Sequence, residues 1–356
     1  MYFDPEPKKM KKDLYDFDAE YQELITALND TKVKFIALYG LRRTGKTSLL
    51  MSTYHGLTGK KLYIDVRQVY PLTPISFSSY FVENLVDMLK DFNLVELLLG
   101  KIKGIEFGVK VELRENSLSV TKILEKLDTA LGNHHQKLVI FIDEAQLLKA
   151  IGFDQVLAYL YDRCTNIKII VAGSEIGILD KLLGQQEDAP LFGRAIKKIT
   201  LKKLSRNQAI EFLTIGFKQL KMAVSINELE DAFKKVDGSI GWLTLLGWYS
   251  FQEKKVSSGI KKVVHEGSKM AHREFLEFLK NREIAKKRYE KILRSLSLAP
   301  LRWRDIKSAL ELEEKKKISN KQVSEYLSHL LDYGFIEKEG IHYRIADPLL
   351  KEAFLQ

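Results

Sequence analysis

The chain has 356 residues, of which 45% are hydrophobic and 29% are charged, and its formal net charge is +10. This length allows two or three domains with cores of their own, and the composition is that of a globular protein. Membrane-spanning helices are excluded because no apolar run approaches the required length of about 20 residues. An internal disulfide is excluded because Cys164 is the only cysteine. We expect a multidomain cytoplasmic protein that does not contact a membrane.

Residues 40–47 form the first motif along the chain. They fit the pattern G-x-x-x-x-G-K-[ST] at every fixed position, between a strand-like run at Phe35–Tyr39 and a helix-compatible stretch that starts at Thr47. The glycines let several backbone N–H groups point at one oxyanion, at the positive end of the new helix. We expect Lys46 to contact the outer phosphates of a nucleotide and the Thr47 hydroxyl to bind Mg²⁺. A chance Gly-Lys-Thr in a strand–turn–helix is the alternative.

A long interval, residues 67–136, follows a second expected strand at 62–66. Apolar residues at helical spacing run over 76–99, and alternating apolar residues over 101–114 indicate a small hairpin. Insertions of this kind usually lie outside the sheet and adapt the core to a partner. We expect the same of this interval.

The second motif is an apolar run at 138–142 that ends in Asp143 and Glu144. An unbroken run rich in β-branched residues is typical of a parallel strand buried on both faces. In enzymes with a phosphate-binding loop, the first carboxylate at this strand end holds magnesium and the second can orient the attacking water. We therefore assign Asp143 to the metal and Glu144 to the water. A strand followed by an acidic helix start is the alternative.

With these two motifs, the chain resembles the archaeal P-loop ATPases related to the AAA+ and STAND groups, over nearly its whole length. Four further segments carry the resemblance, at 17–24, 63–67, 172–174 and 190–194. The chain departs from the family at Ala19, where an arginine is common, and at 238–242, which lacks the proline of a Gly-x-Pro element.

The resemblance implies an α/β fold with a P-loop NTPase core of five parallel strands flanked by helices. The strand before the phosphate-binding loop would be central and flanked by the strand that ends in Asp143 and Glu144. The remaining strands are expected at 167–171 and 196–201. We expect the core to cover residues 1–203, an all-α lid 204–282, and a winged helix-turn-helix domain 283–356.

The resemblance also implies how a nucleotide is held. The cofactor would be ATP or ADP with Mg²⁺, bound by Phe17, Gly40, Leu41, Arg42, Arg43, Thr44, Gly45, Lys46, Thr47 and Ser48. Ser174 would sense the γ-phosphate, a role compatible with capping the next helix. Arg194 would be an arginine finger acting in cis or on a neighbouring subunit, with a surface salt bridge as the alternative. Lys46 and Glu144 complete the catalytic set.

After residue 201 the pattern turns helical. Ser205 and Gln208 form a capping box that opens a helix, and further helices are expected near 226–236, 241–253 and 258–281. Helical patterns at 284–298 and 303–312, a helix opened by Ser319 and a hairpin at 335–345 then predict a winged helix.

The expected recognition helix shows Lys321 but no arginine on its exposed face, and arginine is the commonest reader of guanine. Double-stranded DNA could instead be bound through its phosphates. The candidate residues are Arg302, Arg304, Lys315, Lys316, Lys317 and Lys321. A winged helix that contacts protein is the alternative.

Net charge is distributed unevenly, at −4 over residues 61–190, +8 over 191–280 and +4 over 281–356. Basic surface attracts polyanions, although a solvated lysine-rich surface would give the same count. We expect a Mg²⁺-dependent ATPase that changes conformation to regulate a DNA-associated process. The alternative is a signalling or scaffold ATPase whose winged helix binds protein. A kinase and a helicase are weaker alternatives, and the oligomeric state stays open.

Overall fold

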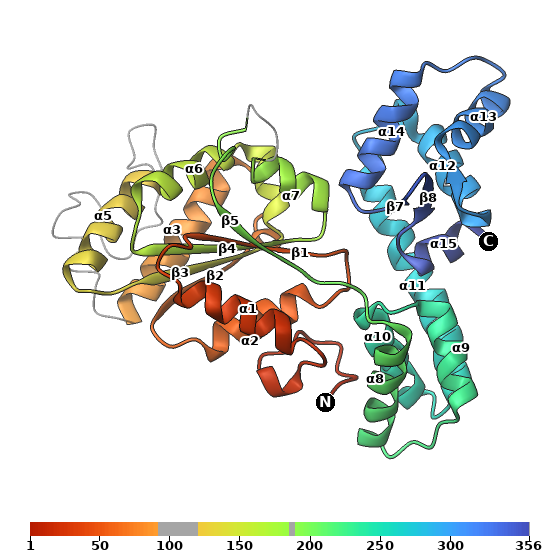
Figure 1. Cartoon of the computed structure of the whole chain (residues 1–356), viewed down its shortest axis with the longest axis horizontal. Helices are drawn as coiled ribbons and strands as arrows, with labels where there is room; N and C mark the ends of the chain where they lie inside the picture. Colours follow the sequence, from red (N-terminus) through yellow and green to blue (C-terminus); the bar gives the residue numbers. More distant parts are fainter. Residues whose placement is uncertain (92–119, 185–188, 356) are drawn as a thin grey trace.

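The structure is a computed structural model that describes residues 1–91, 120–184 and 189–355. An α/β layer comes first along the chain, and a group of helices and a smaller mixed unit follow it (Figure 1). None of the helices in the described ranges combines the length and the apolar character that crossing a membrane demands.

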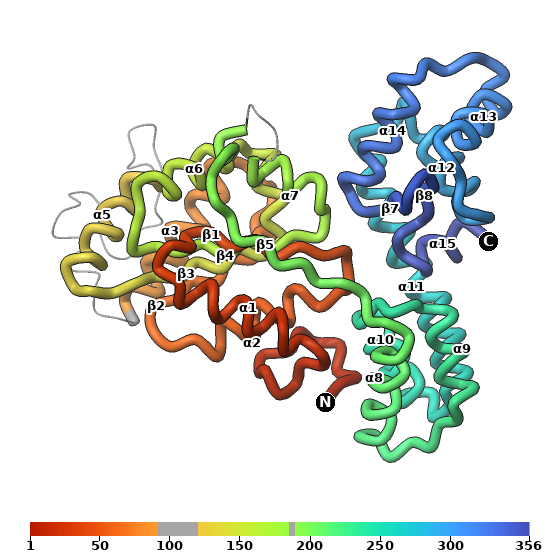
Figure 2. Tube along the Cα trace, viewed as in Figure 1, coloured from red at the N-terminus to blue at the C-terminus, as the bar shows by residue number. Residues whose placement is uncertain are grey.

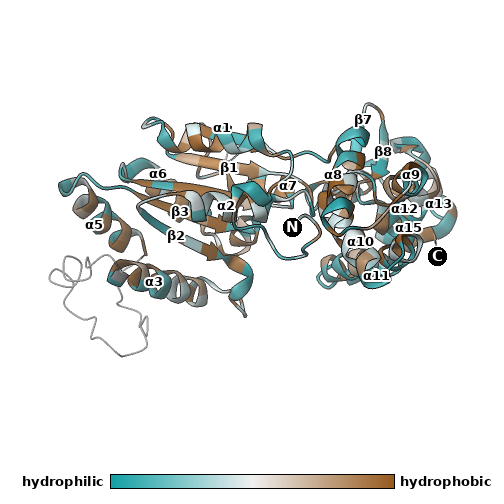
Figure 3. Ribbon diagram, turned by 90° about the horizontal axis from the view of Figure 1, so that it is seen from below, coloured by the Kyte–Doolittle hydropathy of each residue, from teal (hydrophilic) through white to brown (hydrophobic). Residues whose placement is uncertain are grey.

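The α/β layer is built on a sheet of five parallel strands. They are β1 Phe35–Tyr39, β2 Lys60–Asp65, β3 Leu138–Asp143, β4 Ile167–Gly173 and β5 Ile196–Thr200. Every residue of β1, β3 and β4 is buried, which explains why these strands read as continuous apolar runs. Figure 3 shows the apolar strands in brown. All five strands predicted from the sequence are confirmed.

The strand order is β2-β3-β4-β1-β5, so the predicted neighbourhood of the phosphate-loop strand is wrong. β1 lies between β4 and β5, and β3 lies between β2 and β4. The helix after β1, α2 Lys46–Gly56, packs against both β3 and β4. Because α2 reaches across β4, the loop after β1 meets the end of β3, although β1 and β3 are not adjacent.

Helices cover both faces of the sheet. α1 Asp18–Asn29 and α2 pack with one apolar cluster, and the other face carries α3 Pro74–Asp91, α5 Val120–Asn133, α6 Asp154–Arg163 and α7 Ile176–Leu182. Short 3₁₀ helices are η1 Lys11–Asp13, η2 Val66–Gln68 and η3 Ala145–Ile151.

The described part of the interval 67–136 packs on one face of the sheet and belongs to its core. The prediction that this interval lies away from the sheet is therefore wrong. Phe77 and Phe81 of α3, and Leu124 and Leu127 of α5, are buried in the core cluster on one face of the sheet. The dense apolar spacing of these helices supplies the cover that this face requires. The hairpin expected at 101–114 falls outside the described residues.

The helical group contains α8 Arg206–Gln219, α9 Ile226–Val236, α10 Ile240–Gln252 and α11 Val256–Leu279. The capping box at Ser205 is confirmed, and a second one at Ser225 opens α9. The N-terminal segment, expected within the α/β core, contributes Phe3 to this group. A Cβ on Gly216 of α8 or Gly247 of α10 would lie 2.3 or 2.2 Å from the Phe3 ring, so both glycines make room for it.

The last unit has the winged-helix arrangement that the sequence predicted. It contains η4 Glu283–Ala285, α12 Lys286–Leu298, β6 Leu301–Arg302, α13 Trp303–Glu314, α14 Asn320–Asp332, β7 Ile336–Glu339, β8 His342–Ile345 and α15 Pro348–Leu355. Its sheet order is β6-β8-β7. β6 and α15 were not expected.

The helical group and the winged helix share one apolar cluster. α15 packs against α11 and α12, and Trp242, Phe275 and Leu349 belong to the same buried set. Figure 2 shows the chain passing between the two through the long helix α11. The helical group and the winged helix therefore share one core. The buried clusters of the α/β layer are distinct from it.

Candidate nucleotide-binding site

A cleft of about 640 Å³ lies at the carboxyl ends of the strands, where ligands usually bind in open α/β sheets. The phosphate-binding loop forms its floor, and Glu144 and Ser174 line it from the ends of β3 and β4. The start of α10 and the N-terminal segment complete it. Further lining residues are Tyr2, Lys8, Tyr15, Phe17, Arg67, Gln146, Trp242 and Glu274.

The loop at 40–47 turns sharply into α2. Gly45 precedes the helix with φ of 92°, a left-handed conformation that favours glycine. A Cβ at Gly45 would lie 2.6 Å from Cζ of Phe17, so glycine is required by space as well. Phe17 thus packs on the loop and lines the cleft, where the family resemblance placed it.

Lys46 lies on the loop itself. Its Nζ donates to the carbonyl oxygens of Gly40 at 2.8 Å and Leu41 at 2.7 Å. Burial lowers the pKa of this amine to about 8, and Glu144 and Asp143 oppose that shift. A phosphate entering the loop would give the ammonium group a stronger acceptor than a neutral carbonyl.

Two oxygens suited to Mg²⁺ meet between α2 and β3. The Thr47 hydroxyl donates to Oδ2 of Asp143 at 2.9 Å, and the Tyr63 hydroxyl donates to the same oxygen at 3.1 Å. Burial raises the pKa of Asp143, as does Glu144, while the two hydroxyl bonds lower it. Mg²⁺ usually takes one or two protein oxygens, with water and phosphate completing its octahedron. Thr47 and Asp143 fit such an ion.

The Glu144 carboxylate is held by Ser174, the residue after β4, and by Gln146 of η3. Its Oε2 accepts from Gln146 Nε2 at 2.7 Å and from the Ser174 hydroxyl at 3.3 Å. Arg67 Nη1 lies 3.9 Å from the other oxygen. Ser174 does not cap α7, whose N-cap is Glu175 with no side-chain bond. The capping interpretation of Ser174 is therefore wrong, and its γ-phosphate role stays a prediction.

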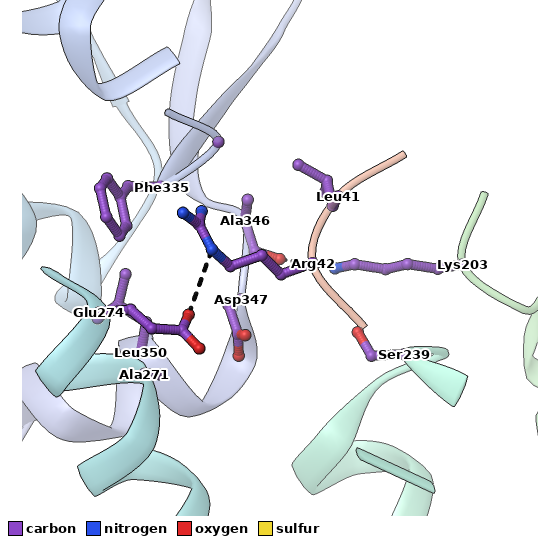
Figure 4. Close-up of a pocket in the computed structure, with 11 residues that line it drawn as sticks. Leu41, Arg42, Lys203, Ser239, Ala271, Glu274, Phe335, Ala346, Asp347 and Leu350 are labelled. Carbon is purple, nitrogen blue, oxygen red and sulfur yellow. Dashed lines mark hydrogen bonds and ion pairs between the residues drawn. The ribbon is translucent and has the colours of Figure 1, made fainter. Parts of the chain in front are cut away.

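Arg42 extends from the loop toward the winged helix. It donates to the Tyr333 carbonyl at 2.8 Å and to Glu175 at 2.7 Å, and its Nε lies 3.5 Å from Glu274 of α11. Burial raises the pKa of Glu175, and Arg42 acts against that rise. Figure 4 shows Arg42 beside Glu274, Asp347 and Phe335.

Arg43 makes a parallel set of contacts. Its guanidinium lies 3.9 Å from the Trp242 ring centroid, 2.5 Å from Glu274 and 3.5 Å from Asp347. Trp242 Nε1 donates to Asp347 at 3.0 Å. We call Arg42, Arg43, Glu274, Asp347 and the Tyr333 carbonyl the seam. The sequence predicted both arginines as nucleotide-binding residues but gave no sign of the seam.

The winged helix meets the α/β layer at further points beside the seam. Lys181 of α7 pairs with Asp332 at the end of α14 at 2.6 Å. Lys203 donates to the Ala346 carbonyl at 2.7 Å. Gly334, with φ of 71°, lies so near Leu41 that a Cβ would approach its side chain to 3.2 Å. The turn after α14 therefore packs directly on the phosphate-binding loop.

Arg194 lies elsewhere. It makes a two-bond pair with Asp162, at 2.9 and 2.6 Å, and it precedes β5, whose first residue pairs with the first residue of β1. Arg194 therefore lies at the amino ends of the strands, whereas the loop lies at their carboxyl ends. The prediction that Arg194 acts on this chain's own nucleotide is wrong, and the salt-bridge alternative describes its contacts. A role on a neighbouring subunit stays a prediction.

In Figure 1 the turn between α13 and α14 lies at the end of the winged helix farthest from α10. Arg302, Arg304, Lys315 and Lys321 are exposed, and Lys316 pairs with Glu314 at 3.2 Å. The sequence predicts a capping box of Ser319 and Gln322 here, and one half of it is present, since the Ser319 hydroxyl accepts from the Gln322 backbone. The structure brings none of these cations near the cleft.

Sequence reasoning missed several cleft residues. Tyr63 contacts Asp143 at the end of β3, Arg67 and Gln146 contact the following Glu144, and Glu175 holds Arg42. The signal available for Gln146 was its place two residues beyond Glu144 on a segment leaving a buried strand. For Arg67 it was the position just after β2, a neighbour of β3.

Residues 14–246 match a family described as an ATPase domain predominantly from Archaea, and residues 283–346 match the C-terminal winged helix-turn-helix domain of MCM proteins. Among solved structures, the Walker-type ATPase PABY2304 of Pyrococcus abyssi is 27% identical, with 100% of both chains covered and a TM-score of 0.82. The ORC2 protein of Aeropyrum pernix, in ADPNP-ADP complexes, is 16% identical, with 99% of this chain and 95% of that chain covered and a TM-score of 0.64. This second likeness concerns the fold alone.

A curated relative, the uncharacterized protein MJ1637 of Methanocaldococcus jannaschii, is 27% identical over 226 residues. The match covers 64% of this chain and 38% of that relative.

Proposed function

Because the chain belongs to the family of ATPase domains found predominantly in Archaea, we propose that it binds ATP with Mg²⁺ and hydrolyses it to ADP and phosphate. The observation that carries this proposal is the placement of Glu144 beside the Thr47–Asp143 pair at the head of the loop. Loop, metal oxygens and a carboxylate for water thereby converge on one cleft.

Each side chain has a distinct task in this proposal. The loop amides and Lys46 hold the phosphates, and Thr47 and Asp143 hold Mg²⁺, which would offset negative charge on the phosphates. Glu144 accepts a hydrogen bond from the attacking water and orients it. A kinase would need a second substrate's hydroxyl beside Glu144, and the sequence shows no acceptor-binding signature for that alternative.

The test is Glu144→Gln. The amide keeps the shape of the side chain but cannot accept a proton, so ATP binding should survive while turnover falls at least about tenfold. Calorimetric ATP titration and phosphate release at saturating ATP measure the two quantities. Omitting Mg²⁺ should abolish turnover of the wild type. An unchanged rate in the variant would contradict the proposed role.

We also propose that the nucleotide biases the orientation of the α/β layer against the rest of the chain. The cleft lies between the two, and the seam joins the loop to both α11 and the winged helix. Since the helical group and winged helix share one core, they would move together. Small-angle scattering of Glu144→Gln with ADP and then ATP should give different profiles. Identical profiles would contradict the switch.

The partner that we propose is double-stranded DNA, bound by the winged helix. Its support is the match of residues 283–346 to a winged helix-turn-helix domain and the charge of +4 over 281–356. A protein partner is the rival, since the seam and the Lys181–Asp332 pair already use this unit for protein contacts.

A duplex titration at several salt concentrations separates the two partners. Phosphate contacts should make log K fall by about 0.9 per contact for each log unit of salt. Reversing Arg302, Arg304 and Lys316 to glutamate should weaken binding for all sequences alike. Absence of binding by the wild type at about 50 mM salt would favour the protein partner.

A further inference from the structure

Gln146 is a buried glutamine that contacts Glu144, the proposed catalytic carboxylate, and the proposed function gives it no task. Gln146 lies in η3 with 3% of its surface exposed. Its Nε2 donates to Glu144 Oε2 at 2.7 Å, a shorter bond than the 3.3 Å bond from the Ser174 hydroxyl to the same atom. Gln146 is therefore the closest polar neighbour recorded for that oxygen.

The other end of the same amide is unsatisfied. Gln146 Oε1 has no hydrogen-bond partner among the described residues and is buried. It lies against β4, where a Cβ on Gly173 would come within 2.6 Å of it. Burying an unpaired oxygen destabilises a fold, so an apolar side chain of the same volume would suit this position better on structural grounds alone. Any advantage of a glutamine over an apolar side chain at this position must therefore come from the hydrogen bond that its Nε2 donates.

That end controls where the Glu144 carboxylate points. The backbone at Glu144 has φ of 53°, a left-handed conformation at the turn from β3 into η3. Arg67, more than half exposed, lies 3.9 Å from Glu144 Oε1 and is an alternative partner for the carboxylate. Without the Gln146 bond, Glu144 could rotate toward the guanidinium and leave the position from which it meets water.

We propose that Gln146 is a positioning residue that holds the Glu144 carboxylate in place for the attacking water, while contributing nothing to the stability of the fold. This inference rests on the proposed ATPase function. Gln146 acts through Glu144 and need not touch the nucleotide.

The test is Gln146→Met, which keeps the length of the side chain and removes both ends of the amide. We expect an unfolding temperature equal to or above that of the wild type, an ATP dissociation constant within about threefold, and kcat lowered at least about tenfold. The double variant with Glu144→Gln should lose no more activity than Glu144→Gln alone, since Gln146 acts through that carboxylate.

Ser268→Ala is the matched control. Ser268 of α11 also has a buried oxygen without a hydrogen-bond partner in the described ranges, but it does not line the cleft. Its replacement should leave kcat unchanged and not lower the unfolding temperature. A folded Gln146→Met variant with normal kcat would overturn the inference, and so would a loss of kcat that follows a lowered unfolding temperature. A wild-type chain without turnover would instead overturn the proposed function itself.

Discussion

Two groups of side chains leave the same phosphate-binding loop and contact different parts of the molecule. Lys46 and Thr47 turn inward, to loop carbonyls and to Asp143 at the end of β3. Arg42 and Arg43 turn outward, to α11 and the winged helix. In the proposed function the inner group supplies the chemistry, whereas the outer group makes contacts between units. A single loop therefore joins both, within six residues of sequence.

The electrostatic settings of the two groups also differ. Lys46 is buried, and among the described residues no carboxylate is in ion-pair contact with it, so its charge is weakly compensated. The seam arginines are partly exposed and already paired with carboxylates. Partial exposure screens those pairs, so each contributes modestly to stability. The inner group is therefore poised for a ligand, whereas the outer group is satisfied by the protein.

The largest effect is expected from Lys46→Ala, which removes the inner charge and leaves the seam intact. A hydrogen bond to a charged group is worth about 1.5–3 kcal/mol, so ATP affinity should fall by about 10–100-fold. Isothermal titration with ATP and Mg²⁺ measures the loss. A change below about threefold would show that the inner group does not bind phosphate.

Arg43→Ala tests the outer group, and we expect it to lower stability rather than ATP affinity. It removes the Trp242 contact and the pairs with Glu274 and Asp347, at a cost of about 1–2 kcal/mol in the free energy of unfolding. ATP affinity should change by less than about threefold, because the side chain faces the seam. Denaturant unfolding and ATP titration test both statements. An affinity loss as large as that of Lys46→Ala would place Arg43 in the inner group.

Glu274→Gln tests the same seam by changing the carboxylate that contacts the two arginines. Glu274 meets both arginines, and neutralising it should lower the free energy of unfolding by about 0.5–1.5 kcal/mol. Glu277→Gln, three residues later on α11, is the control, since Glu277 pairs with Lys280 at the surface. Chemical denaturation at low and high salt compares them. Equal effects of the two substitutions would contradict a special role for the seam.

The smallest effect is expected from Arg194→Ala. Because this residue lies at the amino end of the strands, opposite the loop, turnover should stay within about twofold and stability within about 0.5 kcal/mol of the wild type. Phosphate release measured over a range of protein concentrations is the assay. A turnover loss that appears only at high protein concentration would instead support a role on a neighbouring subunit.

Local patterns account for what the sequence could predict. The buried strands appear as apolar runs, α8 begins at the capping box of Ser205, and the loop appears as a fixed motif. The seam leaves no such pattern, since Arg42 and Arg43 meet partners more than 200 residues away at Glu274 and beyond. Charged pairs have no periodicity, so nothing in the sequence distinguishes these arginines from phosphate ligands.

Strand order escaped prediction for a related reason. The interposition of β4 between β1 and β3 depends on how the crossover helices lie, and no residue pattern within a strand encodes its neighbours. Arg194 was misplaced because motif similarity gives a position along the chain and not the end of the strands at which the residue lies.

The burial of Phe3 between α8 and α10 sets a limit on the order in which this protein can mature. Phe3 fills space beside Gly216 and Gly247, so its native contacts exist only after α10 has been synthesised. At the usual rate of about 5–20 residues per second, that wait lasts roughly 10–50 seconds on the ribosome. During this time the Phe3 ring is unprotected, and the part of the cleft that the N-terminal segment lines is among the last to be closed.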